Sequence, residues 1–325
     1  MLTVFVPRGT QLERIVLEPG ATPPDDAVWI DLVKPTVQED KLVEALLGIA
    51  VPTREEMQEI EVSSRLYVEN DARYMTATLM CHADTPAPIT TPVTFILSAH
   101  KLLTVRYDAP RPFAIVEHKL ARGVAPKFSG EVVLTDLLDA VIDRAADILE
   151  RAGMEVDAIS RTIFEPESEE GEAKSYKDVL KALGRKGDLT SKVRESLVSI
   201  GRLLLFLSNE AETLRWAKDS RSHLQSMRRD TASLSDHATY LANKITFLLD
   251  AMLGVVNIEQ NAIIKIFSIA AVIFMPPTLV ASIYGMNFHH GMIELDWVFG
   301  YPFALALIVF AAVVPIFFFK WKKWL

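Results

Sequence analysis

The chain has 325 residues, of which half are hydrophobic and 23% are charged, and its formal net charge is −8. This acidic balance argues against a nucleic acid as a partner, because nucleic-acid-binding domains present clustered lysine and arginine. The one cysteine, Cys81, excludes an intrachain disulfide and is typical of a protein in a reducing compartment.

Residues 1–130 predict a mixed α/β domain on the cytosolic side. Most of the 17 prolines precede Gly130, which indicates a segment rich in turns. Short apolar and β-branched runs, separated by helical patterns such as 36–47, predict strands. The predicted strands are 27–32, 74–80, 93–97 and 102–106. A hairpin turn is expected at 97–102, and Thr53 to Glu56 has the sequence of a capping box. No signal peptide is predicted, since charged residues interrupt the first 20 positions.

Residues 131–262 predict a helical stalk. One helix is expected near residues 134–148, a second over about 174–220 and a third from about 222. In the third helix, apolar residues recur at alternating steps of four and three, which is a heptad seam. The seam residues are Leu234, Ala238, Leu241, Ile245, Leu248, Met252 and Val255. No stop signal follows the seam, so a single helix from about 222 to 284 is predicted.

Two apolar runs without Asp, Glu, Lys or Arg close the chain, at 266–288 and 297–319. Each run is long enough for a helix to cross the roughly 30 Å hydrocarbon layer of a bilayer. The alternative, two buried helices of a soluble core, is disfavoured because core helices seldom stay uncharged for so many turns. The sequence therefore predicts a membrane domain at 263–325, with spans at about 263–286 and 297–319.

The charges that flank the two spans predict their orientation. Lys265 precedes the first span and a lysine-rich segment, 320–325, ends the chain, whereas the connecting loop holds Glu294 and Asp296 and no lysine or arginine. The positive-inside rule then places both termini in the cytoplasm of a multi-pass protein of the cytoplasmic (inner) membrane. The two loop carboxylates form an acidic rim that is expected to raise the local cation concentration.

One face of the predicted long helix has the pattern of a pore lining. At about 100° per residue, seven side chains fall within a narrow arc that begins with polar groups and continues into the membrane with small or flexible ones. These residues are Asp250, Asn257, Asn261, Ile264, Ser268, Ala271 and Met275. Two spans cannot enclose an aqueous path, so a pore requires several chains around an axis, with Met275 or Ile264 as a constriction. A solvated helix face remains an alternative for the three polar residues at 250, 257 and 261.

The motif Gly285-Met286-Asn287 lies at the end of the first span. Six segments of the chain, one of which contains this motif, have sequences typical of a single known family. These segments are 28–32, 258–268, 274–282, 284–288, 299–302 and 320–325. In all of them the chain resembles the CorA family of magnesium transporters. The resemblance implies a homopentameric, funnel-shaped channel-like transporter in which an α+β cytosolic domain is followed by a helical stalk and two transmembrane helices. It also implies gating by intracellular Mg²⁺, the motif at the outer pore entrance, and Thr278 among the pore-facing residues.

Physical chemistry gives the motif a reason. Because Mg²⁺ releases its waters reluctantly, a ring of neutral Asn287 amide oxygens can bind the hydrated ion without trapping it. Gly285 permits a tight turn near the axis, and Met286 is expected to pack rather than coordinate.

The loop after the motif departs from the family pattern. His289 and His290 follow Phe288, where relatives usually carry an acidic or aromatic pair. Adjacent histidines in a loop are usually only polar surface, but repeated around a pore they would suit Co²⁺, Ni²⁺ or Zn²⁺ better than Mg²⁺. The loop thus leaves the ion preference open.

Three classes of function remain. The first is divalent-cation transport, chiefly of Mg²⁺ with Co²⁺ and Ni²⁺ as further candidates. The second is zinc transport of the related ZntB type, which is disfavoured because that subfamily typically carries Gly-Ile-Asn at the motif. The third is a membrane-anchored cytosolic sensor or enzyme, but residues 1–220 contain no phosphate loop, nucleophile motif or metal-spaced His/Cys cluster. No cofactor is expected beyond transported and regulatory metal, whose cytosolic ligands the spacing does not identify.

Overall fold

The computed structural model describes residues 1–18, 20–123, 128–164, 175–286 and 297–322. By compactness the chain divides into two units, Met1–Leu249 and Asp250–Leu325. The predicted boundaries at 130 and 262, which separate segments by role, stay predictions.

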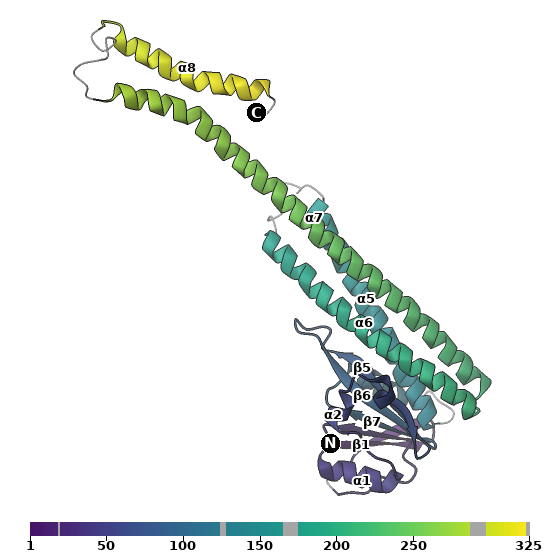
Figure 1. Ribbon diagram of the computed structural model, residues 1–325. Coiled ribbons are helices and arrows are strands. Elements are labelled where there is room, and N and C mark those ends of the chain that lie inside the picture. The colour runs from purple at the N-terminus through teal and green to yellow at the C-terminus, as the bar shows by residue number, and fades with distance from the viewer. Residues whose placement is uncertain (19, 124–127, 165–174, 287–296, 323–325) are drawn as a thin grey trace. The chain divides into compact units, whose positions relative to one another are not determined.

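Seven strands and eight helices make up the described part of the chain (Figure 1). The strands are β1 (Leu2–Arg8), β2 (Gln11–Val16), β3 (Trp29–Val33), β4 (Leu66–Glu69), β5 (Ala72–Cys81), β6 (Ile89–Ser98) and β7 (Lys101–Arg106). The helices are α1 (Val37–Leu47), α2 (Arg54–Met57), α3 (Val62–Arg65), α4 (Arg111–Ala121), α5 (Gly130–Phe164), α6 (Tyr176–Thr213), α7 (Lys218–Tyr284) and α8 (Gly300–Trp321).

All seven strands form one sheet in the order β2-β1-β3-β7-β6-β5-β4. Its one parallel pair among the described strands is β3 with β7, and every other neighbour pair is antiparallel. The four predicted strands are confirmed as β3, β5, β6 and β7. Three strands were missed, and each lacks a clear strand signal: β2 is largely exposed and charged, β4 is a four-residue edge strand, and β1 contains Pro7.

Two local predictions are also confirmed. The chain reverses between β6 and β7, where Ser98 pairs with Lys101 across the hairpin. At the start of α2, the Thr53 hydroxyl accepts from the Glu56 backbone N–H while the Glu56 carboxylate accepts from the Thr53 backbone N–H. The hairpin turn and the capping box both depend on interactions between residues close together in the sequence, so a short segment is enough to predict them.

The sheet has a hydrophobic core on each face. In β1, Phe5 belongs to the core that includes α4, α5 and α6, whereas Val4 and Val6 belong to the core that includes Val43 of α1. This alternation is the two-residue period of a strand buried on both faces. The helix predicted near 134–148 is part of α5, and its Leu134 is buried in the first core, so the sheet and the first two stalk helices share one interior.

The third stalk helix is longer than its neighbours and has no break. The predicted helix from about 222 to 284 is confirmed as α7, a helix of 67 residues. The predicted end of the second helix at 220 was wrong, because α6 ends at Thr213 and the chain reverses through Arg215, whose φ is 55°. The heptad seam is buried in the described structure from Ala238 to Met252.

An aspartate in the β5–β6 connection anchors this loop to two helices. The carboxylate of Asp84 pairs with Arg111 of α4 at 3.0 Å and with Arg144 and Arg151 of α5 at 2.5 and 2.6 Å. Burial raises the pKa of this carboxyl, but the contacts with Arg144 and Arg151 and their charges outweigh it and lower the pKa to about 2.

This low pKa predicts how acid affects stability. The ionised Asp84 stabilises the fold above about pH 4, the ordinary aspartate pKa, and this contribution is lost as the pH falls towards about 2. The Asp84→Asn variant should therefore lose less thermal stability than the parent between pH 5 and pH 2.5, as measured by the unfolding midpoint in detergent. Asp188→Asn, which removes an exposed pair with Lys192, should behave like the parent. Equal acid sensitivity of Asp84→Asn and parent would contradict this assignment.

Candidate functional site

Two helices of the described chain, α7 and α8, are long and apolar enough to cross a membrane. None of the most apolar window of α7 is buried in the structure, and only 6% of that of α8 is buried. A core helix of a soluble protein would be covered by its own chain, so this exposure favours the membrane interpretation.

The predicted pore lining lies along α7. All eight residues expected there are exposed in the single chain, including Ile264 at 53% and Met275 at 69%. The partly covered residues of the apolar part of α7 are Ile269, Ala270, Ile273, Pro276, Pro277, Val280 and Tyr284. At about 100° per residue, this covered set centres opposite the predicted arc. The chain itself thus leaves the arc uncovered, and its role as a pore lining stays a prediction.

The helix ends where the motif begins. The Gly285 N–H donates to the Ala281 carbonyl at 2.9 Å, and the Met286 N–H donates to the Ile283 carbonyl at 3.3 Å, which closes the last turn. A Cβ at position 285 would lie 3.1 Å from the Ala281 oxygen, so a larger residue would crowd this turn. The other predicted residues of this region lie outside the described residues; they are Asn287, His289, His290, Glu294 and Asp296.

Pro276 and Pro277 lie inside α7 without ending it. Each proline lacks the N–H that would bond four residues back, so the carbonyls of Val272 and Ile273 lose their usual helical donors. At the next residue, the Thr278 hydroxyl donates to the Phe274 carbonyl at 2.7 Å. This part of the predicted span therefore has backbone carbonyls without their usual intrahelical hydrogen bonds, whereas in an uninterrupted helix these carbonyls are paired.

The described residues of a single chain do not form a cytosolic metal site. In the described ranges, no group of three or more His, Cys, Asp or Glu side chains is placed to hold a metal ion.

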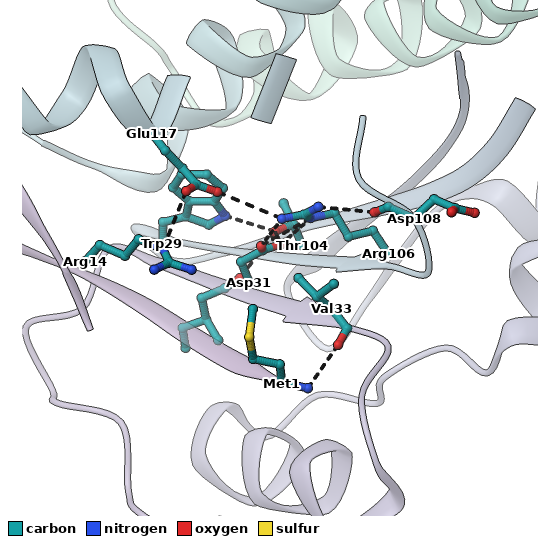
Figure 2. A network of polar contacts seen from close by, with 10 residues as sticks. Met1, Arg14, Trp29, Asp31, Val33, Thr104, Arg106, Asp108 and Glu117 are labelled. Carbon is teal, nitrogen blue, oxygen red and sulfur yellow. Dashed lines mark hydrogen bonds and ion pairs between the residues drawn. The ribbon is translucent and has the colours of Figure 1, made fainter. Parts of the chain in front are cut away.

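The segment 28–32, the early part of the resemblance, belongs to a buried polar network (Figure 2). Arg106 of β7 donates to both carboxylate oxygens of Asp31 on β3, with the shortest contact at 2.7 Å. The Thr104 hydroxyl donates to Asp31 at 2.6 Å and accepts from the Trp29 indole N–H at 2.9 Å. These contacts join the parallel strands β3 and β7 in the middle of the sheet, so the segment has a structural role.

Glu117 of α4 extends this network. Its carboxylate lies 3.9 Å from the Arg106 guanidinium and 3.5 Å from that of Arg14. Burial and the nearby negative charge of Asp31 raise the pKa of Glu117, against the opposing effect of the two arginines. Sequence reasoning missed this partner, since 86 positions separate it from Asp31 and no spacing rule links them.

Comparison with known proteins agrees with this architecture over the whole chain. The family described as "CorA-like Mg2+ transporter protein" matches residues 24–322. The magnesium transport protein CorA of Yersinia pseudotuberculosis is 35% identical over 329 residues and that of Escherichia coli K12 is 34% identical over 325 residues, with all of both chains covered in each case. The chain belongs to the CorA family. The suspected family membership is thereby confirmed.

Solved structures support the same fold. The CorA magnesium transporter of Methanocaldococcus jannaschii aligns with all of this chain and 99% of its own, with a TM-score of 0.74 at 19% identity. The cytoplasmic domain of ZntB from Vibrio parahaemolyticus covers 78% of this chain and 97% of its own, with a TM-score of 0.54 at 10% identity. The α+β domain, helical stalk and two apolar C-terminal helices are thus the CorA fold, and ZntB is the more distant neighbour.

Proposed function

We propose that this protein is the subunit of a channel-like transporter that carries Mg²⁺ across the cytoplasmic membrane. The carrying observation is the position of Gly285-Met286-Asn287, directly after the last turn of an uncovered apolar helix. Full-length relatives at 34 and 35% identity bear the name magnesium transport protein, which supports the same cargo. Membership of a family of ion transporters also makes the protein a transporter rather than an enzyme or a sensor without a pore.

The active form in this proposal is a homopentamer. Two spans per chain cannot surround water, so the face of α7 from Asp250 to Thr278 lines an axis that several copies share. In this proposal both termini lie in the cytoplasm, which the lysines that flank the spans support by the positive-inside rule. Mg²⁺ that binds the cytosolic part closes the pore, because α7 runs without a break from that part into the predicted span.

Each polar level of the arc has a role in this scheme. Asp250 attracts cations at the inner end, and Asn257 and Asn261 offer neutral oxygens to a hydrated ion. Ile264 and Met275 form apolar constrictions that can close by excluding water, and the small Ser268 and Ala271 leave room between them.

A second cargo class has one observation in its favour. His289 and His290 precede the acidic residues Glu294 and Asp296, and imidazole nitrogens prefer Co²⁺, Ni²⁺ and Zn²⁺ to Mg²⁺. Transport of these metals is therefore the alternative to a magnesium-selective pore.

Flux measurements test the cargo. Purified protein in proteoliposomes should take up Mg²⁺ faster than Co²⁺, Ni²⁺ or Zn²⁺ at equal concentration, and uptake should stop when Mg²⁺ is raised on the cytosolic side. Zn²⁺ uptake with no Mg²⁺ uptake would replace the proposal with the ZntB-type alternative.

Cysteine accessibility tests the pore-lining face. The native Cys81 is a suitable background, since it is buried and burial raises the pKa of its thiol to about 12. Cysteines at Asn261 and Met275 should react with small water-soluble thiol reagents in the conducting state, whereas a cysteine at Ile273, on the opposite face, should not. The opposite pattern of labelling would move the pore to another face of α7.

A further inference from the structure

A second site lies in the first unit, where α6 crosses the β4–β5 edge of the sheet. An open pocket of about 530 Å³ is lined there by Ile60, α3, β4, β5 and the 191–202 part of α6. This volume lies within the range of roughly 300–1,000 Å³ that is usual for small-molecule sites. The α6 side is tied to the sheet by the Ser199 hydroxyl, which accepts from the Thr78 backbone N–H at 2.9 Å.

The pocket contains a half-buried cation, Arg65, whose hydrogen bonds within the described residues go to neutral groups. The Arg65 guanidinium donates to the Thr78 hydroxyl at 3.1 Å and to the Glu59 backbone carbonyl. A guanidinium carries five N–H donors in a planar fork, so donors remain free to bind a further group. Burial lowers the pKa of Arg65, and the positive charge of Arg202 lowers it further, against the opposing effect of Glu195. This is an environment in which a negative partner would be stabilising.

Two more arginines line the same pocket from α6. Arg194 and Arg202 are both exposed, and Glu195 is the one carboxylate that joins them in the lining. Within the described part of the chain, Arg65, Arg194 and Arg202 form no ion pair. Three arginines against one glutamate make a positive site in a chain whose net charge is −8. Arginine forks match phosphate oxygens with two parallel hydrogen bonds, which a lysine or a metal-binding carboxylate cannot offer.

Apolar side chains also line the pocket. They are Ile60, Val62 and Val198, which are 87%, 48% and 40% exposed, and Val198 lies between Arg194 and Arg202 on α6. Exposed isoleucine and valine side chains beside a cluster of cations suit a ligand with an apolar ring at one end and negative oxygens at the other.

We propose that this pocket binds a nucleotide-sized metabolite, with its phosphate groups on Arg65, Arg194 and Arg202 and its base against Ile60 and Val198. The metal-free form is the preferred ligand. Mg²⁺ on the phosphates would neutralise the charge that the arginines recognise and would itself be repelled by them. This role rests on the proposed transport function. When cytosolic Mg²⁺ is scarce, more of the metabolite is metal-free, so it occupies the pocket and the transporter responds to its concentration.

Binding of radiolabelled ADP to the purified full-length protein in detergent, with EDTA present, tests this site. The parent should bind ADP saturably, and the double variant Arg194→Gln/Arg202→Gln should bind it at least about tenfold more weakly, since each arginine supplies a charged hydrogen bond. Arg185→Gln removes an exposed arginine of the same helix outside this pocket and should bind like the parent. Excess Mg²⁺ should weaken binding to the parent.

Other results overturn the proposal. Absence of saturable ADP binding, or equal binding by the parent and the double variant, removes the site. Equal affinity for inorganic phosphate and ADP removes the role of the apolar side chains, and tight binding of adenosine removes that of the arginines. Because the assay measures no transport, failure to bind ADP by protein with normal Mg²⁺ flux counts against this pocket alone, and ADP binding without Mg²⁺ flux counts against the transport function alone.

Discussion

The Asn287→Ala variant should lose nearly all Mg²⁺ flux in proteoliposomes while it still assembles. In the proposed pore, each copy would lose an amide that hydrogen-bonds the hydrated ion, worth about 1 kcal/mol, and symmetry would repeat the loss in every subunit. We therefore expect at least about a 100-fold decrease in initial rate. Fluorescent Mg²⁺ indicators in the vesicles measure the rate, and size-exclusion chromatography measures the oligomer.

A matched asparagine supplies the control. Asn209 is exposed on α6 in the first unit, and Asn209→Ala should keep the parental rate. Near-normal uptake by Asn287→Ala with intact assembly would remove Asn287 from the selectivity site. Loss of the oligomer together with flux would instead give this asparagine a role in assembly.

The Arg106→Met variant should be strongly destabilised. It leaves the Asp31 carboxylate buried, with 1% of its surface exposed, and without the cation that donates to both of its oxygens. Breaking one side of a buried pair costs about 3–5 kcal/mol, so the unfolding midpoint of the first unit should fall by about 10 °C. Methionine retains an apolar stem over the Phe113 ring, which lies 4.5 Å from the guanidinium, so the loss reports mainly on charge.

Two comparisons separate charge from packing. Arg8→Ala removes exposed pairs with Glu13 and Asp26, and should leave the midpoint nearly unchanged. The double variant Asp31→Leu/Arg106→Met removes both buried charges and should recover much of the stability that Arg106→Met loses. A double variant as unstable as Arg106→Met would show that the network contributes more than charge balance.

The sequence was most informative where one period persists over many residues. The heptad seam from Leu234 to Val255 and the uncharged run that begins at 266 predicted α7 correctly, because helical periodicity is local and repeated. Edge strands such as β2 escaped prediction, since their outward residues are charged and their pairing partners are set by tertiary contacts.

The candidate sites divide in the same way. Gly285-Met286-Asn287 is contiguous, so it was recognisable from the sequence, and the arc on α7 follows from helix geometry alone. The network of Asp31, Arg106 and Glu117 joins residues from three elements, and no spacing in the sequence predicts it. The arginine pocket has the same character, because more than a hundred residues separate Arg65 from its partners on α6.

Because α7 is continuous, the directions in which its buried seam and its exposed arc face depend on each other. In a helix without a break, the number of residues between the buried seam and the exposed arc fixes the angle between them, at about 100° for each residue. A single residue inserted between Leu253 and Val256 would turn the arc from Asn257 onward by about 100° relative to the buried seam, while an inserted heptad would return it to within about 20°. The orientation of the predicted pore lining is therefore sensitive to the number of residues in this segment of α7, whatever their side chains are.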